Sequence, residues 1–411
     1  MDPLLAAALA VHGRGHRPAQ VGDGQPALAR TLEAIRLHLG MDVAFISEIA
    51  GGRRWFRHVD AQDPQGPVQV GASDAVEASY CQRVIDGRLP ELMADACLNP
   101  EALTLAATRA LPVGAHLSVP IRFADGQLYG TFCCFSHAAN HTLNERDLAM
   151  MRVVAELLAG HVQQDLQQRD AALQIERRLD TVLQHGGLQM MYQPIVDLAA
   201  GRVAGFESLA RFAADPQRPP DVWFSEAAQV GRAAELESRA IRLALAALAV
   251  LPSTLYVAVN ASPPMIVQGE LARLLQDQPL HRIVLEVTEH QAVESYEAIA
   301  AVVQPLQAAG LRLAIDDAGA GYASFRHILN LRPEIVKLDI SITRAIDTDR
   351  SRRALAAALC GFSRETGCTI VAEGIETAAE LATLQHLGIQ NAQGFHLGRP
   401  MPLAQARTLV R

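Results

Sequence analysis

Short apolar segments that end on a polar side chain recur through the second half of this chain. Six of them end on a carboxylate, an amide or a lysine, and a weaker seventh ends on Gln393. The six lie at residues 203–207, 255–260, 283–286, 311–317, 335–337 and 369–373. A short apolar run of this kind is typical of a buried parallel strand whose last side chain lies at an end of the sheet.

Stretches with helical character separate these expected strands. The clearest lie at residues 237–250, 296–309 and 352–366. Repeated alternation of strand and helix, with polar side chains gathered at the carboxyl ends of the strands, is typical of a (β/α) barrel. The pattern therefore predicts an α/β fold, a TIM-like (β/α) barrel, and also the end of the barrel that carries a functional site.

The size and composition of the chain limit its class. With 411 residues it is long enough for two or three domains. Half of the residues are hydrophobic but only 5% are aromatic, which favours helix-rich α/β structure over a β-sandwich. The net charge of −8 gives no basic field that would attract a nucleic acid polymer, so we expect no such partner. An anionic substrate would have to be held by local charge or by metal.

The sequence does not predict membrane insertion. An apolar run at residues 4–11 follows Asp2, where a signal peptide needs positive charge, and no stretch reaches the roughly eighteen apolar residues that span a bilayer. We therefore expect a cytoplasmic protein. Its six cysteines form no CxxC pair and are interpreted as reduced, buried thiols. Redox sensing is the alternative for four of them, namely Cys81, Cys97, Cys133 and Cys134.

The pattern along the chain divides it into four parts. Residues 1–25 form an arm without periodicity, and residues 26–162 are predicted to form a compact α+β domain. Residues 163–186 continue its last helix as a linker, and the barrel follows at 187–411. In the α+β domain we expect helices at 27–39, 80–86 and 144–162 and strands at 43–49, 116–123 and 128–135.

The linker helix is polar on most of its faces. Its apolar positions, Leu166, Leu173, Leu179 and Leu183, form only a partial heptad, and the glycines at 186–187 end it. A helix of this kind is seldom stable alone, so it either pairs with a second copy or bridges two domains. On this basis we expect a homodimer.

Five carboxylates at the expected strand ends would meet in one pocket of such a barrel: Glu207, Glu286, Asp316, Asp317 and Glu373. Together they carry a charge of about −5, and each pair at roughly 6 Å repels by about 3 kcal/mol at an effective dielectric of about 20. The pocket must therefore hold protons or cations. Two divalent ions together with Lys337 would bring it to about neutral. With the amide oxygen of Asn260 the carboxylates are hard oxygen ligands, which favour Mg²⁺ or Mn²⁺ over Zn²⁺.

Taken singly, each of these residues also has a purely structural explanation. Asn260 precedes Ser-Pro-Pro and resembles a turn residue, while Glu373 before a glycine resembles a capped turn. Lys337 resembles a lysine that reaches out from a strand end, and Glu207 could pair with Arg211. Their joint occurrence at successive strand ends favours a two-metal site, which stabilises in-line attack of water on a phosphodiester.

Eight segments resemble, in order, the motifs of EAL-domain cyclic-di-GMP phosphodiesterases. They lie at residues 192–195, 207–211, 259–262, 285–289, 316–322, 336–339, 372–376 and 393–395. The resemblance runs from Leu188 to the C-terminus. It implies a barrel that binds cyclic di-GMP and hydrolyses it to linear pGpG with two Mg²⁺ or Mn²⁺ ions in each active site.

The resemblance also assigns roles to single residues. It implies a first metal held by Glu207, Asn260, Glu286 and Asp316, and a second held by Asp316, Asp317 and Glu373. Lys337 and Gln393 correspond to residues that position or activate the attacking water, and Glu289 to the glutamate that holds the loop after Asp317. The substrate side would be formed by Gln193, Arg211, Glu376 and Phe395.

The chain departs from the family pattern in two places. Ser208 stands where the family has Ala, next to the first metal glutamate, and contributes no ligand. Ala318 and Ala320 stand where the family carries Phe and Thr or Ala, so the loop is expected to be less anchored.

Because every metal position is intact, we favour an active enzyme. The alternatives are a non-catalytic cyclic-di-GMP receptor and an unrelated metal-dependent barrel such as an aldolase, which would not explain the ordered motifs.

The front domain resembles a GAF domain. The supporting segments lie at 117–121, 125–131 and in the closing helix at 145–162. The resemblance implies a sensor that regulates the barrel, since GAF domains commonly bind a small molecule or dimerise, and the sequence does not identify a ligand. No Cys-His pair is placed as in bilin-binding members, so a covalent chromophore is not expected.

Overall fold

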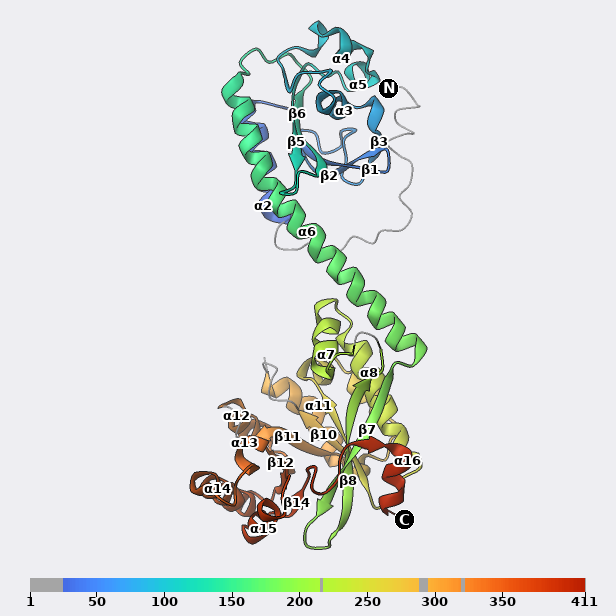
Figure 1. Ribbon diagram of the computed structural model, residues 1–411, viewed down its shortest axis with the longest axis vertical. Coiled ribbons are helices and arrows are strands. Elements are labelled where there is room, and N and C mark those ends of the chain that lie inside the picture. The colour runs from blue at the N-terminus through green and yellow to red at the C-terminus, as the bar shows by residue number, and fades with distance from the viewer. Residues whose placement is uncertain (1–24, 215–216, 288–294, 319–321, 411) are drawn as a thin grey trace. The chain divides into compact units, whose positions relative to one another are not determined.

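The structure is a computed structural model that describes residues 25–214, 217–287, 295–318 and 322–410 (Figure 1). The chain divides into two compact units, Met1–Ala171 and Ala172–Arg411. Among the described residues, no helix combines the length and apolar character needed to cross a membrane.

The front unit is built on one antiparallel sheet of six strands in the order β3-β2-β1-β6-β5-β4. Its strands are β1 (Val43–Ala50), β2 (Arg53–Ala61), β3 (Ser73–Ala75), β4 (Leu92–Met93), β5 (Ala115–Arg122) and β6 (Leu128–Ser136). The three strands expected from sequence are confirmed as β1, β5 and β6. Strand β2 is a finding of the structure, and it pairs with β1 along its whole length.

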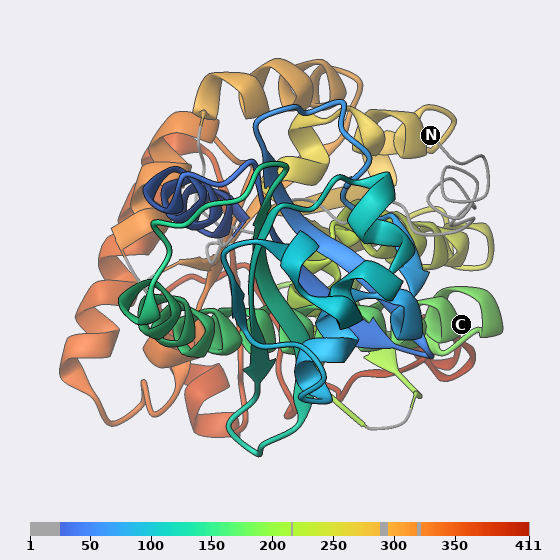
Figure 2. The ribbon, with the colours of Figure 1, turned by 90° about the horizontal axis from the view of Figure 1, so that it is seen from above.

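Helices cover both faces of this sheet (Figure 2). One face packs against α2 (Gln25–Leu39) and the first part of α6 (Glu145–His185). The other face packs against α3 (Tyr80–Ile85) and the segment that contains α4 (Pro100–Thr104) and α5 (Ala106–Ala110). Because side chains alternate along a strand, the neighbours Cys133 and Cys134 of β6 belong to different cores.

Helix α6 is 41 residues long and is followed by Gly186, whose φ of 80° only glycine adopts without strain. Its first part contributes Leu148, Met151 and Leu158 to the core of the front unit. Its last turns contribute Ile175, Leu179 and Val182 to a core of the second unit, together with Trp223. The continuous helix expected from sequence is therefore present, and its C-terminal turns are part of the barrel unit.

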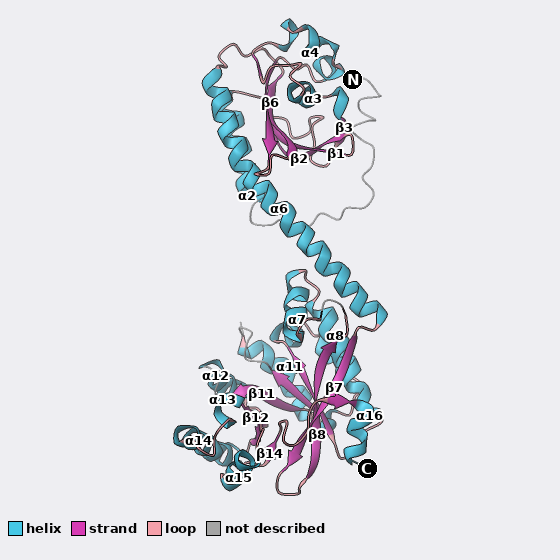
Figure 3. Ribbon diagram, viewed as in Figure 1, coloured by secondary structure: helices cyan, strands magenta, loops and turns pink. Residues whose placement is uncertain are grey.

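The second unit is a closed barrel, whose strands lie among helices in Figure 3. Eight strands from β7 to β14 pair in sequence order, β14 pairs back onto β7, and β15 is added to β7. All neighbours from β8 to β14 are parallel, whereas β7 runs antiparallel to β8 and β14. The strands are β7 (Leu188–Asp197), β8 (Arg202–Phe212), β9 (Tyr256–Ala261), β10 (Ile283–Val287), β11 (Arg312–Ala318), β12 (Ile335–Leu338), β13 (Thr369–Ala372), β14 (Asn391–Ala392) and β15 (Met401–Pro402).

The seven strands expected from sequence correspond to β8 to β14, and the TIM-like barrel is confirmed. Strands β7 and β15 were not expected. The helices of this unit are α7 (Pro220–Gln229), α8 (Ala233–Leu245), α9 (Pro263–Val267), α10 (Glu270–Leu275), α11 (Tyr296–Ala308), α12 (Tyr322–Leu331), α13 (Ile340–Thr343), α14 (Arg350–Thr366), α15 (Ala378–His386) and α16 (Leu403–Ala406). The three helical stretches expected from sequence correspond to α8 with the 3-10 turn after it, α11 and α14.

Candidate active site and metal centre

The two-residue period of the strands brings the polar side chains into the barrel. A buried apolar layer inside the barrel includes Ala258, Val284, Ala314, Ile335 and Val371. In each strand the residue two positions further along lies on the same side of the sheet and one layer nearer to the carboxyl end. Those residues are Asn260, Glu286, Asp316, Lys337 and Glu373.

Strand β8 adds Glu207 to this layer. Two residues before it lies Gly205, where a Cβ atom would stand 2.6 Å from the ring of Tyr256. Only glycine leaves room for this ring inside the barrel, and the next inward position on β8 is then Glu207. Glu207 also lies opposite Gln193 in the antiparallel pair of β7 and β8.

The centre of the site is the ammonium group of Lys337, which is 1% exposed. Its Nζ lies 2.8 Å from Glu373 Oε1, 3.0 Å from both Glu286 Oε2 and Asp316 Oδ1, and 3.5 Å from Glu207 Oε2. Four strands therefore direct carboxylates at one buried cation. The structure thus brings four of the five carboxylates expected in one pocket around Lys337.

The electrostatics of the cluster are set by burial and by the excess of carboxylates. Burial, together with the neighbouring carboxylates, raises the pKa of Glu286 and of Glu373 well above the ordinary value, although Lys337 acts in the opposite direction. Burial alone would lower the pKa of Lys337, but Asp316, Glu207 and the other carboxylates raise it well above the ordinary value. One ammonium cannot balance five carboxylates, so the site attracts further cations or protons.

A second group of carboxylates lies beside this cluster. Asp316, Asp317 and Glu373 each offer a carboxylate oxygen, and these oxygens lie within 4.8 Å of one another. The register of β11 against β12 shifts between Ile315 and Ala318, so both aspartates fall in an irregular part of the strand. Asp317 has a φ of 54°, a conformation that costs about 1–3 kcal/mol at a non-glycine residue. The strained backbone at Asp317 lies in the same segment that brings the carboxylates of two consecutive aspartates to one site.

Asn260 completes the oxygen donors. It lies opposite Glu286 in the parallel pair of β9 and β10, at the same level of the barrel. The residue after next, Ser262, is fixed by Glu237, whose carboxylate accepts hydrogen bonds from the Ser262 N–H at 2.9 Å and from its Oγ at 2.8 Å. Carboxylate and amide oxygens without sulfur suit Mg²⁺ or Mn²⁺.

A chain of buried amides supports Glu207 from the other side. Gln393 Nε2 donates to Glu207 Oε2 and, at 3.0 Å, to Gln193 Oε1. Gln193 Nε2 in turn donates to the carbonyl of Gly398 at 3.0 Å. The other amide atom of Gln393, its Oε1, is buried without a hydrogen-bond partner among the described residues. Within this series of amides, the Oε1 atom of Gln393 is therefore the hydrogen-bond acceptor that remains available to a water or a substrate.

The remaining predicted site residues lie further out. Arg211 is exposed and donates to the carbonyl of Ala210 at 2.7 Å, and Glu376 is exposed and pairs with Arg344. Phe395 is 50% exposed, with the guanidinium of Arg399 at 4.3 Å from its ring centre. Glu289 and Ala320 lie outside the described residues.

Two contacts at the site were not foreseen. Thr343 of α13 donates from its Oγ1 to the backbone carbonyl of Glu373 at 2.5 Å, and Ser208 donates to the carbonyl of Ala258 at 2.6 Å. The hydroxyl of Ser208 therefore has a partner, although it replaces the family's alanine in a buried position. Both contacts join segments distant in sequence, so no local pattern signalled them.

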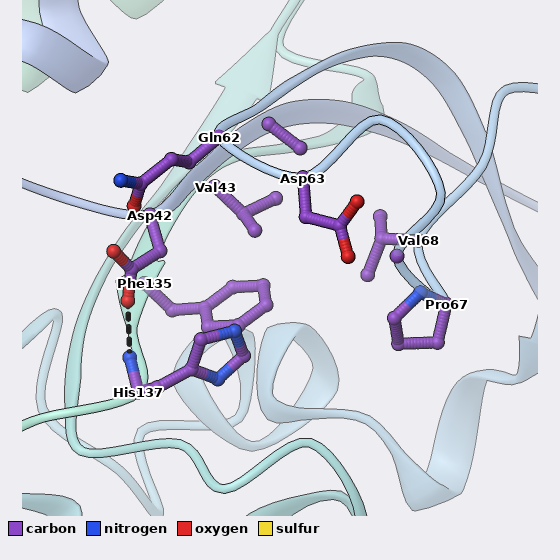
Figure 4. A pocket seen from close by; sticks show the side chains of 10 residues that line it. Asp42, Val43, Gln62, Asp63, Pro67, Val68, Phe135 and His137 are labelled. Atoms are coloured by element: carbon purple, nitrogen blue, oxygen red, sulfur yellow. Dashed lines mark hydrogen bonds between the residues drawn. The ribbon is translucent and has the colours of Figure 1, made fainter.

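The front unit contains a separate cavity of about 190 Å³ (Figure 4). It lies at the ends of β1 and β6, and its apolar wall includes Val43, Val68 and Phe135. Asp42 also lines it and accepts a hydrogen bond from the backbone N–H of His137 at 2.7 Å. A cavity of this size admits only a small ligand.

Comparisons with known proteins agree with this architecture. A family model described as EAL domain matches residues 176–400, and one described as GAF domain matches residues 23–162. Cyclic di-GMP phosphodiesterase PA2567 of Pseudomonas aeruginosa is 31% identical over 55% of this chain and 40% of that protein. Cyclic di-GMP phosphodiesterase PdeF of Escherichia coli is 27% identical over 72% of this chain and 42% of that protein. The chain spans between about a fifth and two fifths of the length of the curated relatives it matches.

Solved structures give the same result. The PaMucR phosphodiesterase in complex with c-di-GMP has a TM-score of 0.52 and 28% identity over 57% of this chain and 99% of that chain. The EAL enzyme Bd1971, bound to cAMP and cyclic-di-GMP, has a TM-score of 0.56 over 90% of this chain and 95% of that chain. At 18% identity the latter shows a likeness of fold alone. Both resemblances found in the sequence are confirmed.

Proposed function

This chain belongs to the EAL domain family, and from that membership we propose that it is a metal-dependent phosphodiesterase that hydrolyses cyclic di-GMP to linear pGpG. The observation that carries the proposal is the layer of carboxylates around Lys337, with the oxygens of Asp316, Asp317 and Glu373 beside it. Burying such a layer of carboxylates is costly unless cations bind to it.

The donor set fits two divalent ions. Glu207, Asn260, Glu286 and Asp316 would hold the first, and Asp317 and Glu373 would hold the second together with Asp316. Ions bound there supply Lewis acidity and neutralise charge that develops on the phosphodiester. Mg²⁺ and Mn²⁺ are the candidates because every donor is an oxygen atom.

The other residues of the site orient water and substrate. Lys337 and Gln393 both contact Oε2 of Glu207, and the free acceptor Oε1 of Gln393 would hold a proton of the attacking water. Arg211 would bind a substrate phosphate, with Gln193, Glu376 and Phe395 on the substrate side. Glu289 would hold the loop after Asp317.

Regulation is the role proposed for the front unit. The GAF domain would bind a small molecule, for which the cavity beside Phe135 is a candidate site, and would act on the barrel through α6 in a homodimer. The support is the continuity of α6, which contributes side chains to a core in each unit.

The test is direct. Purified protein is incubated with cyclic di-GMP and Mg²⁺ or Mn²⁺, and the nucleotides are separated by chromatography. Turnover to pGpG is expected, and Asp316→Asn should lower it at least about a hundredfold, because it takes the negative charge and one of the two carboxylate oxygens from the residue that both ions would share. The exposed Asp347→Asn is the matched control and should leave turnover unchanged.

Ca²⁺ should support binding of cyclic di-GMP but little turnover, because it prefers longer and looser coordination than Mg²⁺.

The alternative function is a receptor that binds cyclic di-GMP without cleaving it. Binding to the folded protein without pGpG in either Mg²⁺ or Mn²⁺ would favour it. If the folded protein neither binds nor cleaves cyclic di-GMP, then cyclic di-GMP is not the substrate of the barrel. Full turnover by Asp316→Asn would remove the metal assignment.

A further inference from the structure

Two cysteines of the front unit lie in van der Waals contact inside its core. Cys81 is on α3 and Cys133 is on β6, and their Sγ atoms are 3.4 Å apart. Both residues are fully buried, on the face of the sheet covered by α3. None of the chemistry proposed for the barrel uses them.

A buried arginine distinguishes this pair from packing cysteines. Arg54 of β2 donates from Nη1 to Cys81 Sγ at 3.1 Å. Its Nε and Nη2 are both taken by the carboxylate of Asp74, and its guanidinium lies over the ring of Phe56 at 4.7 Å. Arg54 is therefore fixed by its other partners with one N–H group aimed at the sulfur of Cys81.

The two thiols differ in their surroundings. The Sγ atom of Cys133 lies 3.1 Å from Thr131 Oγ1 and 3.0 Å from the hydroxyl of Ser118. Burial alone would raise the pKa of Cys81, but the hydrogen bond with Cys133 and the charge of Arg54 lower it to about 5. Burial, with the neighbouring Cys81, raises the pKa of Cys133 well above the ordinary value. One sulfur is thus suited to attack as a thiolate, and the other stays a thiol.

The neighbouring Cys134 shows what a packing cysteine looks like in the same strand. It faces the other core, and its Sγ lies 4.0 Å from the sulfur of Met151. Burial raises the pKa of Cys134 above its ordinary value. A metal site at Cys81 and Cys133 is disfavoured, because the guanidinium of Arg54 would face the bound cation.

We propose that Cys81 and Cys133 form a redox site of the front unit, in which hydrogen peroxide converts the two thiols into a disulfide. The Cys81 thiolate attacks one oxygen of the peroxide, the O–O bond breaks, and the departing hydroxide takes up a proton to become water. The thiol of Cys133 then attacks the sulfur of the resulting sulfenic acid, and a second water leaves with its proton. The two thiols lose two electrons in total, and the peroxide gains them.

The geometry makes the second step short. The sulfur atoms need to close only from 3.4 Å to roughly 2.05 Å, the length of a disulfide bond. Because both sulfurs are buried, peroxide reaches them when the six-residue helix α3 opens locally. A thiol exchange reagent such as dithiothreitol restores the reduced pair.

The test uses the full chain. The reduced protein is treated with hydrogen peroxide, free thiols are alkylated after unfolding, and peptides are mapped by mass spectrometry. A Cys81–Cys133 link that dithiothreitol removes is the expected product, with Cys134, Cys360 and Cys368 alkylated. Alkylated Cys81 and Cys133 under conditions that oxidise the exposed Cys97 would overturn the proposal.

Variants separate the two neighbouring cysteines. Cys134→Ala should leave the link intact, whereas Cys133→Ser should abolish it and leave a sulfenic acid on Cys81 that dimedone traps. Arg54→Gln should slow formation of the link by about tenfold, because the cation that favours the thiolate is lost. A link that persists in Cys133→Ser through another cysteine would contradict the assignment. Should a variant fail to fold, the peptide map of the unaltered protein decides alone.

Discussion

At the scale of single residues, the position of Lys337 decides the character of the site. Its ammonium group is the counter-ion of four buried carboxylates, which removing the lysine would leave without a positive partner among the described side chains. The same carboxylates are the proposed metal ligands. Lys337 and the divalent ions would therefore neutralise the same carboxylates. Removing the lysine should change how much bound metal stabilises the barrel.

We predict that Lys337→Met lowers the free energy of unfolding in EDTA by about 3–5 kcal/mol, the usual cost of breaking a buried ion pair. Adding Mg²⁺ should then raise the melting temperature of the variant by more than it raises that of the unaltered protein. Thermal unfolding of both proteins with and without Mg²⁺ measures this difference. Equal increments would mean that the ions and the lysine do not share the carboxylates.

Ser208 is the residue at which the chain departs from the family's name motif. Its hydroxyl is buried and donates to the carbonyl of Ala258 at 2.6 Å. We predict that Ser208→Ala costs about 1 kcal/mol of stability, the net value of one hydrogen bond. Turnover of cyclic di-GMP should stay within about twofold. A large loss of turnover with unchanged melting would give Ser208 a role in the chemistry.

At the scale of elements, the end of β11 leads into the loop that was expected from sequence to be less anchored. The small Ala318 suggested a loop with little anchoring. The structure buries Ala318 completely in the core cluster that contains Ile315, and the Asp339 N–H donates to its carbonyl at 3.4 Å. The strand is thus anchored up to Ala318, and the residues that follow lie outside the described part.

From this burial we predict that Ala318→Phe destabilises the barrel by about 1–3 kcal/mol, since a packed core resists a larger side chain. The melting temperature and the turnover at several protein concentrations report the effect. Ala199→Phe, at an exposed turn, is the control and should change neither. Higher turnover with an unchanged melting temperature would restore the idea of a loop that lacks its aromatic anchor.

The elements also show where sequence reasoning succeeds. The barrel strands from β8 to β14 were predictable because each is an apolar run that ends on one polar residue, and the two-residue period then directs that residue inward. Strand β7 was not predicted, because periodicity does not report strand direction or closure. Strand β2 was missed because Arg54 occupies one of its inward positions, where an apolar residue is normally expected.

The candidate site was predictable in its residue types and only partly in its contacts. The carboxylates, Asn260 and Lys337 follow from the strand ends. The support of Glu207 by Gln393 does not, because the two residues are 186 positions apart and meet only when β14 closes the barrel onto β7. The contact of Cys81 with Cys133 is of the same kind, since it depends on how α3 packs on β6.

At the scale of the whole molecule, α6 is the element that both units share. The stretch expected as a linker, residues 163–186, includes Ile175, Leu179 and Val182, which are buried beside Trp223 in the second unit. Arg178 reinforces this contact with an ion pair to Glu226 at 2.9 Å. The last turns of α6 are therefore needed by the barrel unit itself, and a fragment that tests the barrel must begin before them.

We predict that a fragment of residues 172–411 folds and turns over cyclic di-GMP, whereas one of residues 187–411 does not fold stably. The shorter fragment loses three buried apolar side chains, each worth about 1.5–3 kcal/mol, which together approach the stability of a typical domain. Trp223 reports the outcome by fluorescence, because the other tryptophan, Trp55, is absent from both fragments.

The same fragment measures what the front unit does to the barrel. If α6 pairs in a homodimer and transmits the state of the GAF domain, the turnover of the full chain should differ several-fold from that of residues 172–411, as expected for a coupling of about 1–3 kcal/mol. Light scattering of the full chain reports its mass in the same buffer. Stable folding of the shorter fragment, residues 187–411, would mean that the apolar contacts of Ile175, Leu179 and Val182 are dispensable. Equal rates for a monomeric full chain and for residues 172–411 would mean that the front unit does not act on the barrel.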